Sequence, residues 1–151
     1  MAAKTRKITD NLTFNNARIV FRNFTGRAGR FNAEGIRSFS VVIEDEEFAH
    51  QLEHDGWNIK WPKPREDGET LAPTLPVAVS FDPYPPRIKQ VQEGGGEVWL
   101  DASNVFTLDD AEIISCSMVI RPYNYEVNGS TGVKAYLKDM KVEVARDIFC
   151  D

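Results

Sequence analysis

Two alternating sequences near the end of the chain constrain the fold more than any other feature. Residues 123–127 and 133–138 alternate in character, and the segment between them, residues 128–132, contains two glycines. A period of two is typical of β-strands, and a short glycine-containing connection is typical of a β-hairpin. The second arm places one set of side chains on a common face: Lys134, Tyr136 and Lys138. Because aliphatic residues occupy the other face, we expect one packed face and one face free to bind.

Further alternating sequences predict a mostly β fold. Residues 17–24 and 37–43 have strand character, and the loop between them contains three glycines and two arginines, so they are expected to form a long antiparallel hairpin. Other strands are expected at residues 57–61, 75–81, 87–91, 113–121 and 140–145, the last continuing the second arm of the final hairpin. At least five strands, with no internal repeat and no regular alternation with helices, favour a small barrel or a sandwich.

One substantial helix is predicted after residue 44. Asp45 is a capping residue, acidic side chains fill the first turn, and Gly56 stands where a left-handed residue ends a helix. The apolar stripe of this helix consists of Phe48, Ala49 and Leu52. A second, single helical turn is predicted to open at residues 107–110, whose sequence resembles a capping box.

Length and composition indicate one globular domain. The chain has 151 residues, 42% of them hydrophobic and 27% charged, which suits one core and is too short for two ordinary domains. Its apolar runs are far shorter than the roughly 20 residues needed to cross a bilayer. No apolar region follows the basic N-terminus, so no secretory signal is expected, and two widely spaced cysteines indicate no disulfide framework. We therefore expect a cytoplasmic protein that does not bind membranes.

Charge is distributed unevenly along the chain. The net charge of −5 argues against binding nucleic acid by bulk attraction. However, residues 1–40 carry eight basic and two acidic side chains, whereas residues 41–70 carry three basic and nine acidic ones. This asymmetry predicts one face that attracts anions and another that repels them.

Aromatic side chains interleaved with lysine and arginine predict a surface for single-stranded nucleic acid, because bases stack on aromatic rings while cations follow the phosphates. This interleaving occurs in three parts of the chain. The candidate residues are Arg22, Arg27, Arg30, Phe31, Arg37, Phe39, Trp57, Lys60, Trp61, Arg121, Tyr123, Tyr125, Lys134, Tyr136 and Lys138. Four other phenylalanines are expected to fill the core: Phe21, Phe48, Phe81 and Phe106.

Sequence patterns for catalysis are weak. His50, Glu53 and His54 match the H-x-x-E-H spacing of a zinc hydrolase, but these histidines are predicted to face solvent, opposite the apolar stripe. No further histidine could act as the base for a serine or cysteine nucleophile. The glycines at 94–96 lack the lysine and the strand-to-helix context of a phosphate loop. We therefore expect no enzyme activity, no metal and no cofactor.

The final hairpin resembles that of a known family. The pattern Arg121-Pro-Tyr123-x-Tyr125-x-x-Asn128-Gly129-x-x-Gly132-Val133-Lys134-Ala135-Tyr136-Leu137-Lys138 is similar to the terminal barrel hairpin of phage-encoded single-stranded DNA-binding proteins with an OB-fold. Residues 17–21 and the basic loop after them fit the first hairpin of the same family. The resemblance implies a small five-stranded OB-like barrel with one helix and long connecting loops. The expected core spans about residues 12–145, with short ends at residues 1–11 and 146–151.

The resemblance also implies a function. In that family the two hairpins border a groove that binds single-stranded DNA without reading sequence, during replication or recombination. By motif position, Arg27, Arg30 and Arg37 would contact phosphates, and the final hairpin would supply the opposite wall. Replication or recombination proteins are further partners that this implies. The alternative is a protein-binding module, such as a phage inhibitor of a host enzyme, whose acidic middle block mimics nucleic acid.

Overall fold

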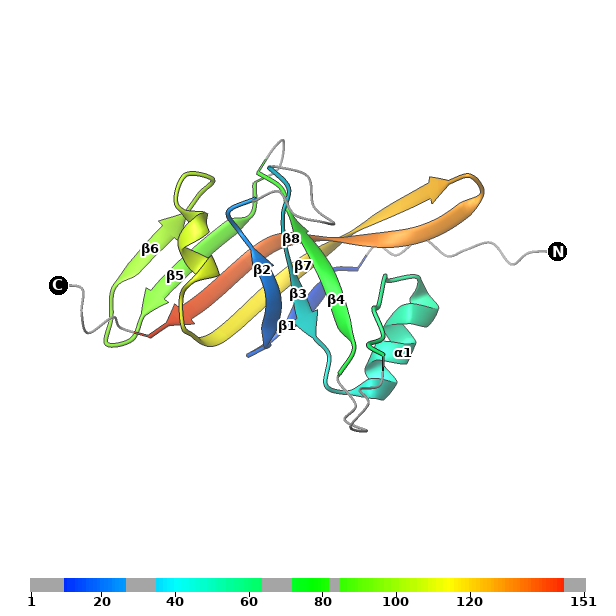
Figure 1. Cartoon of the computed structure of the whole chain (residues 1–151), viewed down its shortest axis with the longest axis horizontal. Coiled ribbons are helices and arrows are strands. Elements are labelled where there is room, and N and C mark those ends of the chain that lie inside the picture. Colours follow the sequence, from blue (N-terminus) through cyan, green and yellow to red (C-terminus); the bar gives the residue numbers. More distant parts are fainter. Residues whose placement is uncertain (1–9, 27–34, 64–71, 82–84, 146–151) are drawn as a thin grey trace.

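Two strands of 15 residues each, β7 (Ile113–Val127) and β8 (Ser130–Val144), run the length of the molecule as one antiparallel ribbon (Figure 1). The computed structural model describes residues 10–26, 35–63, 72–81 and 85–145. The other strands are β1 (Leu12–Phe14), β2 (Ile19–Asn23), β3 (Arg37–Val42), β4 (Thr74–Val79), β5 (Arg87–Gln92) and β6 (Glu97–Leu100). The helical elements are α1 (Glu46–Asp55) and the 3₁₀ helix η1 (Val105–Asp109).

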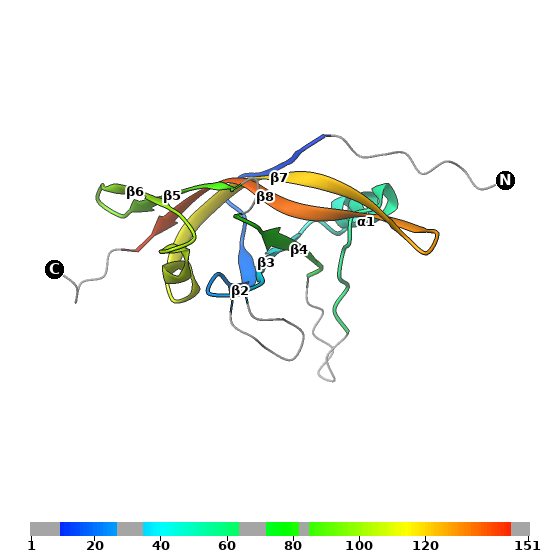
Figure 2. The same ribbon diagram turned by 90° about the horizontal axis from the view of Figure 1, so that it is seen from above.

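The ribbon organises every other strand. The main path of the sheet is β1-β7-β8-β4-β3-β2, and β5 pairs with β8 further along, followed by β6. The amide N–H of Ala17, just before β2, donates to the carbonyl O of Cys116 in β7 at 2.7 Å, which joins the far end of this path back to β7. In the view of Figure 2, β2, β3 and β4 lie on one side of the molecule and the β7–β8 ribbon lies on the other, facing them. The sheet therefore curls into an OB-like barrel.

The barrel interior is filled by alternate residues of its strands. Phe39, Val41, Leu75 and Val77 point inward from β3 and β4 and are almost fully buried. The rings of Phe24 and Phe39 stack with their centroids 5.4 Å apart. This period of two keeps the intervening side chains on the outer face of the same strands.

The helix α1 forms as its capping residues predict. The carboxylate of Asp45 accepts a hydrogen bond from the amide of Phe48 at 3.2 Å, and Gly56 ends the helix with a φ of 108°. Its buried residues are Ala49 and Leu52, while Phe48 packs at the border of the core. The predicted strand at 57–61 is reduced to two isolated bridges, Trp57 with Val133 and Lys60 with Thr74.

The 3₁₀ helix η1 is attached to the end of β2. The carboxylate of Asp109 accepts hydrogen bonds from the amides of Phe24 at 2.6 Å and Thr25 at 3.0 Å. Arg22 donates to the carbonyl oxygens of Leu108 and Ala111, both at 2.7 Å. The predicted helical turn therefore exists, but it begins after Asn104, three residues before the expected start.

The mostly β fold with one α-helix is confirmed. The hairpin of residues 17–43, the long final hairpin and its continuation to residue 144 all form as predicted. The described part of the chain forms eight strands, which agrees with the prediction of at least five. The sequence did not indicate β1 and β6, because they are too short to alternate recognisably. None of the described helices is long and apolar enough to span a membrane.

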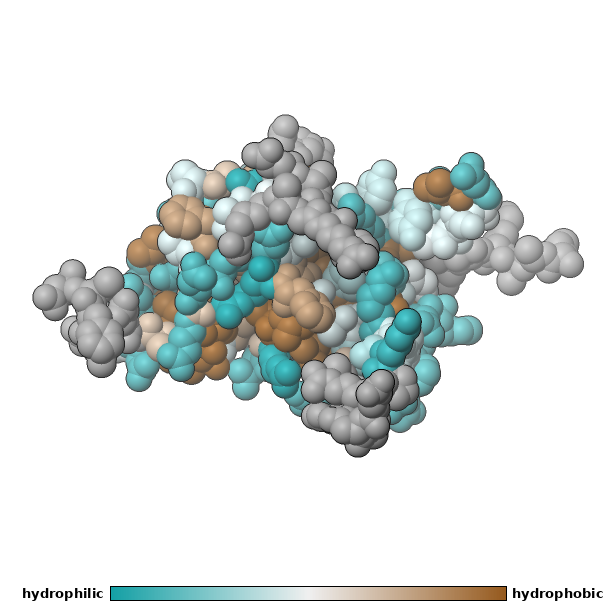
Figure 3. All heavy atoms as spheres, in the orientation of Figure 1, coloured by the Kyte–Doolittle hydropathy of each residue, from teal (hydrophilic) through white to brown (hydrophobic). Residues whose placement is uncertain are grey.

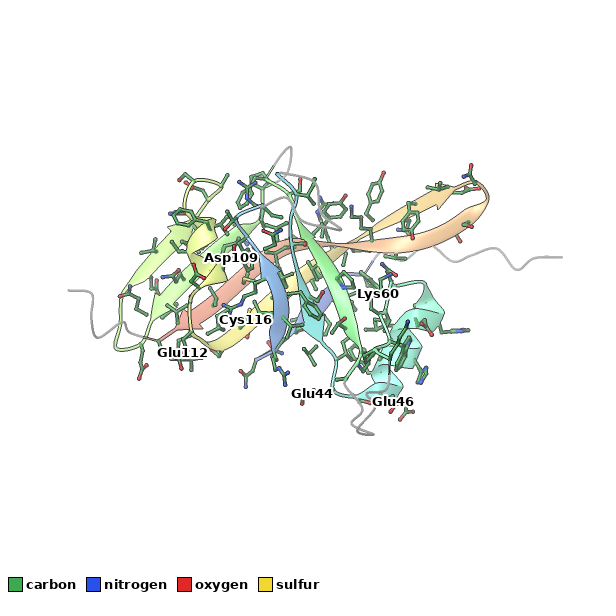
Figure 4. The ribbon with its side chains drawn as sticks, viewed as in Figure 1. Glu44, Glu46, Lys60, Asp109, Glu112 and Cys116 are labelled. Carbon is green, nitrogen blue, oxygen red and sulfur yellow. The ribbon has the colours of Figure 1, made fainter. Side chains whose placement is uncertain are left out.

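Burial makes the Cys116 thiol unreactive. This residue is labelled in Figure 4 and lies in β7. It has no exposed surface, and burial raises the pKa of its thiol to about 12. An exposed thiol is largely ionised at pH 9, but Cys116 stays protonated there, so it should react with a disulfide reagent only after unfolding. Ellman's assay on the Cys150→Ser variant at pH 9 tests this, with the same protein in denaturant as the positive control. Rapid labelling of the native protein would contradict the burial.

Candidate nucleic-acid interface

Small side chains form a floor on the outer face of the barrel. Ser38 and Ser40 of β3 lie opposite Ala78 and Pro76 of β4. They point outward because their neighbours in the two strands point into the core. Ser40 is only 7% exposed, so the accessible floor consists of Ser38, Pro76 and Ala78. These small side chains let a ligand approach the sheet closely, and larger side chains rise on both sides of them.

The final hairpin supplies one wall. Tyr123 faces Lys134 across the ribbon, and Arg121 faces Tyr136, so all four side chains share the outer face. The Tyr136 ring has the Arg121 guanidinium 4.8 Å from its centroid and the Lys134 ammonium at 5.2 Å. The Tyr123 ring meets it edge-on at 5.9 Å. Aromatic and cationic groups therefore alternate along this wall.

Tyr125 owes its position to a glycine. It pairs with Gly132 on β8, and a Cβ placed on that glycine would lie only 2.5 Å from the Tyr125 hydroxyl oxygen. The phenol therefore lies across the partner strand, over the space that any other residue would fill. Tyr125 and Lys134 border a hollow whose other lining includes Ser38 and Pro76 of the floor.

Phe21 stands on the opposite wall in a strained conformation. Its φ is +54°, a left-handed value that bulky residues rarely adopt, and its side chain is 77% exposed. The register between β2 and β3 shifts between Val20 and Asn23, as expected for a β-bulge that redirects a side chain. With Arg18, Lys60 and Trp61, Phe21 lines a second hollow on the outer face.

Trp61 is held in place by the helix α1. Its indole N–H donates to the carboxylate of Glu53 at 2.7 Å, and its ring stacks on His50 with centroids 4.3 Å apart. The residues that mimic a zinc motif therefore orient an aromatic ring at the edge of the second hollow. The described residues contain no group of three potential metal ligands.

The outer face carries both charges and apolar surface. Figure 3 shows apolar side chains at the middle of the face over β2 and β3, with hydrophilic side chains around them. Lys60, between α1 and β4, projects beside β4 (Figure 4). Glu44 also lines the second hollow, and its carboxylate reduces the net positive charge that Arg18 and Lys60 give to this hollow. Among the described residues, the first hollow is lined by Lys134 and by no acidic side chain.

The structure gathers about half of the sequence-predicted candidates on this face. Those it brings to the two walls are Lys60, Trp61, Arg121, Tyr123, Tyr125, Lys134 and Tyr136, with Lys138 exposed beside them on β8. The candidates Arg27, Arg30 and Phe31 lie outside the described residues.

Of the other four candidates, two are buried and two make hydrogen bonds to main-chain carbonyl groups. Phe39 is 1% exposed and Trp57 is 3% exposed, so neither offers a ring to a base, and their prediction as surface residues was wrong. Phe39 points inward by the alternation of β3, and Trp57 packs at the isolated bridge to Val133. Arg22 binds the main chain of the η1 region. Arg37 donates to the carbonyl of Phe24 at 3.1 Å.

Sequence reasoning missed Phe21 and misplaced Phe106. Both were expected in the core, but both are exposed. In a regular strand Phe21 would share the face of Ile19, which packs against the core, and only the bulge breaks this alternation. No local sequence signal marks the bulge. For Phe106, the short 3₁₀ turn leaves its side chain outward while Val105 and Leu108 turn inward.

Comparison with known proteins identifies the family. Residues 1–150 match the family model described as “Putative phage ssDNA-binding domain”, and the chain belongs to this family. No curated protein matches the sequence.

Solved structures share the fold. The C-terminally truncated single-stranded DNA-binding protein of bacteriophage Enc34 aligns with a TM-score of 0.54 at 12% identity, covering 97% of this chain and 98% of that one. The same phage protein in complex with ssDNA aligns with a TM-score of 0.51 at 14% identity, covering 99% and 100% of the two chains. The OB-like barrel is thus shared across nearly the whole length.

The strain at Phe21 makes a prediction about stability. Asparagine tolerates the left-handed region better than phenylalanine, and the exposed ring contributes little burial. We expect Phe21→Asn to leave the free energy of unfolding unchanged or to raise it by about 0.5 kcal/mol. Urea denaturation measures this, with the neighbouring Val20→Asn variant as a control in the same strand. A loss above about 1 kcal/mol would show that the ring is part of the packing.

Proposed function

We propose that this protein binds single-stranded DNA along the outer face of its barrel, without reading sequence. The observation that supports this most directly is the pair of walls that flank the small-residue floor. Each wall combines exposed aromatic rings with cations: Tyr123, Tyr125 and Lys134 on one side, and Phe21, Trp61 and Lys60 on the other. Single strands expose both the faces of their bases and their phosphates, and this surface is complementary to both.

Base stacking and charge neutralisation would both contribute to binding. The tyrosine rings offer flat surfaces that every base can stack on, which explains binding that tolerates any sequence. Arg121 and Lys134 sit beside the Tyr136 ring, where they could neutralise phosphates on either side of a stacked base. A duplex hides its bases, so it would gain only the weaker electrostatic part of this interaction.

We infer that the protein acts by binding rather than by catalysis, needing no metal or cofactor. The description of its family names a phage binding domain. Such a protein would coat the transient single strands that form inside the host cell during phage DNA replication or recombination. Proteins of these two processes are then its expected partners.

Fluorescence anisotropy tests the proposal, with a labelled oligo-dT of about 30 nucleotides and the matching duplex as ligands. The length of this oligonucleotide exceeds the roughly 4–16 nucleotides that one OB unit covers. Preferential binding to the single strand, weakening as salt rises, is the expected result. Absence of binding at low salt would overturn the proposal. Attention would then move to the acidic residues around α1 as a surface that binds another protein and mimics nucleic acid.

Tyr125 and the glycine beneath it should act together. Tyr125→Ala removes one stacking surface, and Gly132→Ala displaces the same ring by steric conflict. Each variant should weaken binding to oligo-dT by about tenfold, since one stacked base contributes roughly 1–3 kcal/mol.

The double variant should be no weaker than Tyr125→Ala alone, because both changes remove the same contact. Tyr125→Phe keeps the ring and serves as the matched control, with affinity near that of the wild type. Wild-type affinity in all four variants would place Tyr125 outside the binding surface.

Lys134 should contribute a phosphate contact. Its replacement by glutamine is expected to reduce the slope of log affinity against log salt by about 0.7, the value for one contact with a single strand. Lys134→Arg keeps the charge and should keep the slope. An unchanged slope in Lys134→Gln would exclude a phosphate contact at this position.

A further inference from the structure

A second aromatic and cationic cluster lies on the β5–β6 hairpin, away from the two walls. Trp99 of β6 is 62% exposed. Lys89 pairs with it across the hairpin, with the ammonium 5.7 Å from the centroid of the indole ring. A large exposed indole beside a lysine repeats the arrangement of Lys134 and Tyr136 in the proposed interface.

This cluster lies on the same face of the sheet as the hairpin wall. β5 pairs with β8 in parallel, placing Lys89 beside Lys141 and Arg87 beside Asp139. Along β8, Asp139 and Lys141 follow Tyr136 on the outer face, since Leu137, Met140 and Val142 point inward. From Gly132 to Lys141 the strand covers about 30 Å at about 3.3 Å per residue. The outer face of β8 therefore runs from the position opposite Tyr125 to the position beside the Trp99 cluster, across the register shift that leaves Lys138 without a partner on β7.

The surface beside Trp99 is suited to binding a flexible anionic chain. A hollow there is lined by Thr13, Ser117 and Val119 together with the cations Arg87, Lys89 and Lys141. Arg87 pairs with Asp139 at 2.8 Å and Lys89 with Glu97 at 2.9 Å, so two of the three positive charges have acidic neighbours. Lys141 is exposed and has no such ion pair among the described residues. The cluster is therefore positive by one charge overall.

We propose that single-stranded DNA leaving the hairpin wall continues along the outer face of β8 and stacks a base on Trp99. This inference rests on the proposed function and extends it to a second stacking site. The same ligand serves both clusters because both combine an exposed ring with a cation and share one sheet face. Spanning about 30 Å takes roughly nine nucleotides at the stacked rise of 3.4 Å per nucleotide, so only longer strands reach both sites.

Calorimetric titration with oligo-dT of two lengths tests this extension. A strand of about 5 nucleotides is near the lower limit for one OB unit, and one of about 20 nucleotides can reach Trp99. Trp99→Ala should weaken binding of the long strand by about tenfold and leave the short strand unaffected. Trp99→Phe keeps a ring for stacking and should restore most of the affinity for the long strand.

Val98→Ala is the matched control. Val98 neighbours Trp99 on the same strand, is also exposed, and faces the opposite side of the hairpin. It should bind both strands as the wild type does. If Trp99→Ala binds the long strand as tightly as wild type, the second site is excluded while the hairpin wall stands. If the wild-type protein binds neither strand, the proposed function fails and the extension falls with it.

Discussion

The pairing of β7 with β8 is the constraint on which the rest of the structure depends. Fourteen residue pairs fix which side chains of the ribbon point into the barrel and which point outward. The register shift between Val119 and Ile120 lies between the half of the ribbon that pairs with β5 and the half that presents the tyrosines. A slip by one residue would bury Tyr136 and expose Leu137, destroying the core and the proposed interface together.

The sequence predicts the parts of this arrangement that local rules control. Alternation and a glycine-containing turn specify the final hairpin, so the outward positions of Tyr123, Tyr125 and Lys134 follow from the sequence alone. Asp45 and Gly56 likewise specify the ends of α1. Contacts between distant segments are not specified in this way. Trp57 is buried because it meets Val133, 76 positions away, and nothing near Trp57 in the sequence announces this contact.

The net charge of the chain does not describe the charge of its proposed binding surface. The net charge is −5, yet the walls of the outer face present lysines and arginines. Part of the acidic block has a structural task, since Glu53 holds the indole of Trp61 by a hydrogen bond. The H-x-x-E-H pattern likewise positions a ring through His50. Glu53 and His50, which in the sequence suggest an acidic protein-binding surface and a zinc site, therefore position a ring of the proposed interface.

Phe21 gives a further physical reason to regard the outer face as a binding surface. A left-handed backbone costs a bulky residue stability, and a ring that is 77% exposed recovers little of this by burial. Folding alone therefore does not account for a phenylalanine at this position. The bulge aims the ring into the hollow that Lys60 and Trp61 also line. A base stacked on the ring would bury it, and this contact would compensate for the stability that the strained backbone costs.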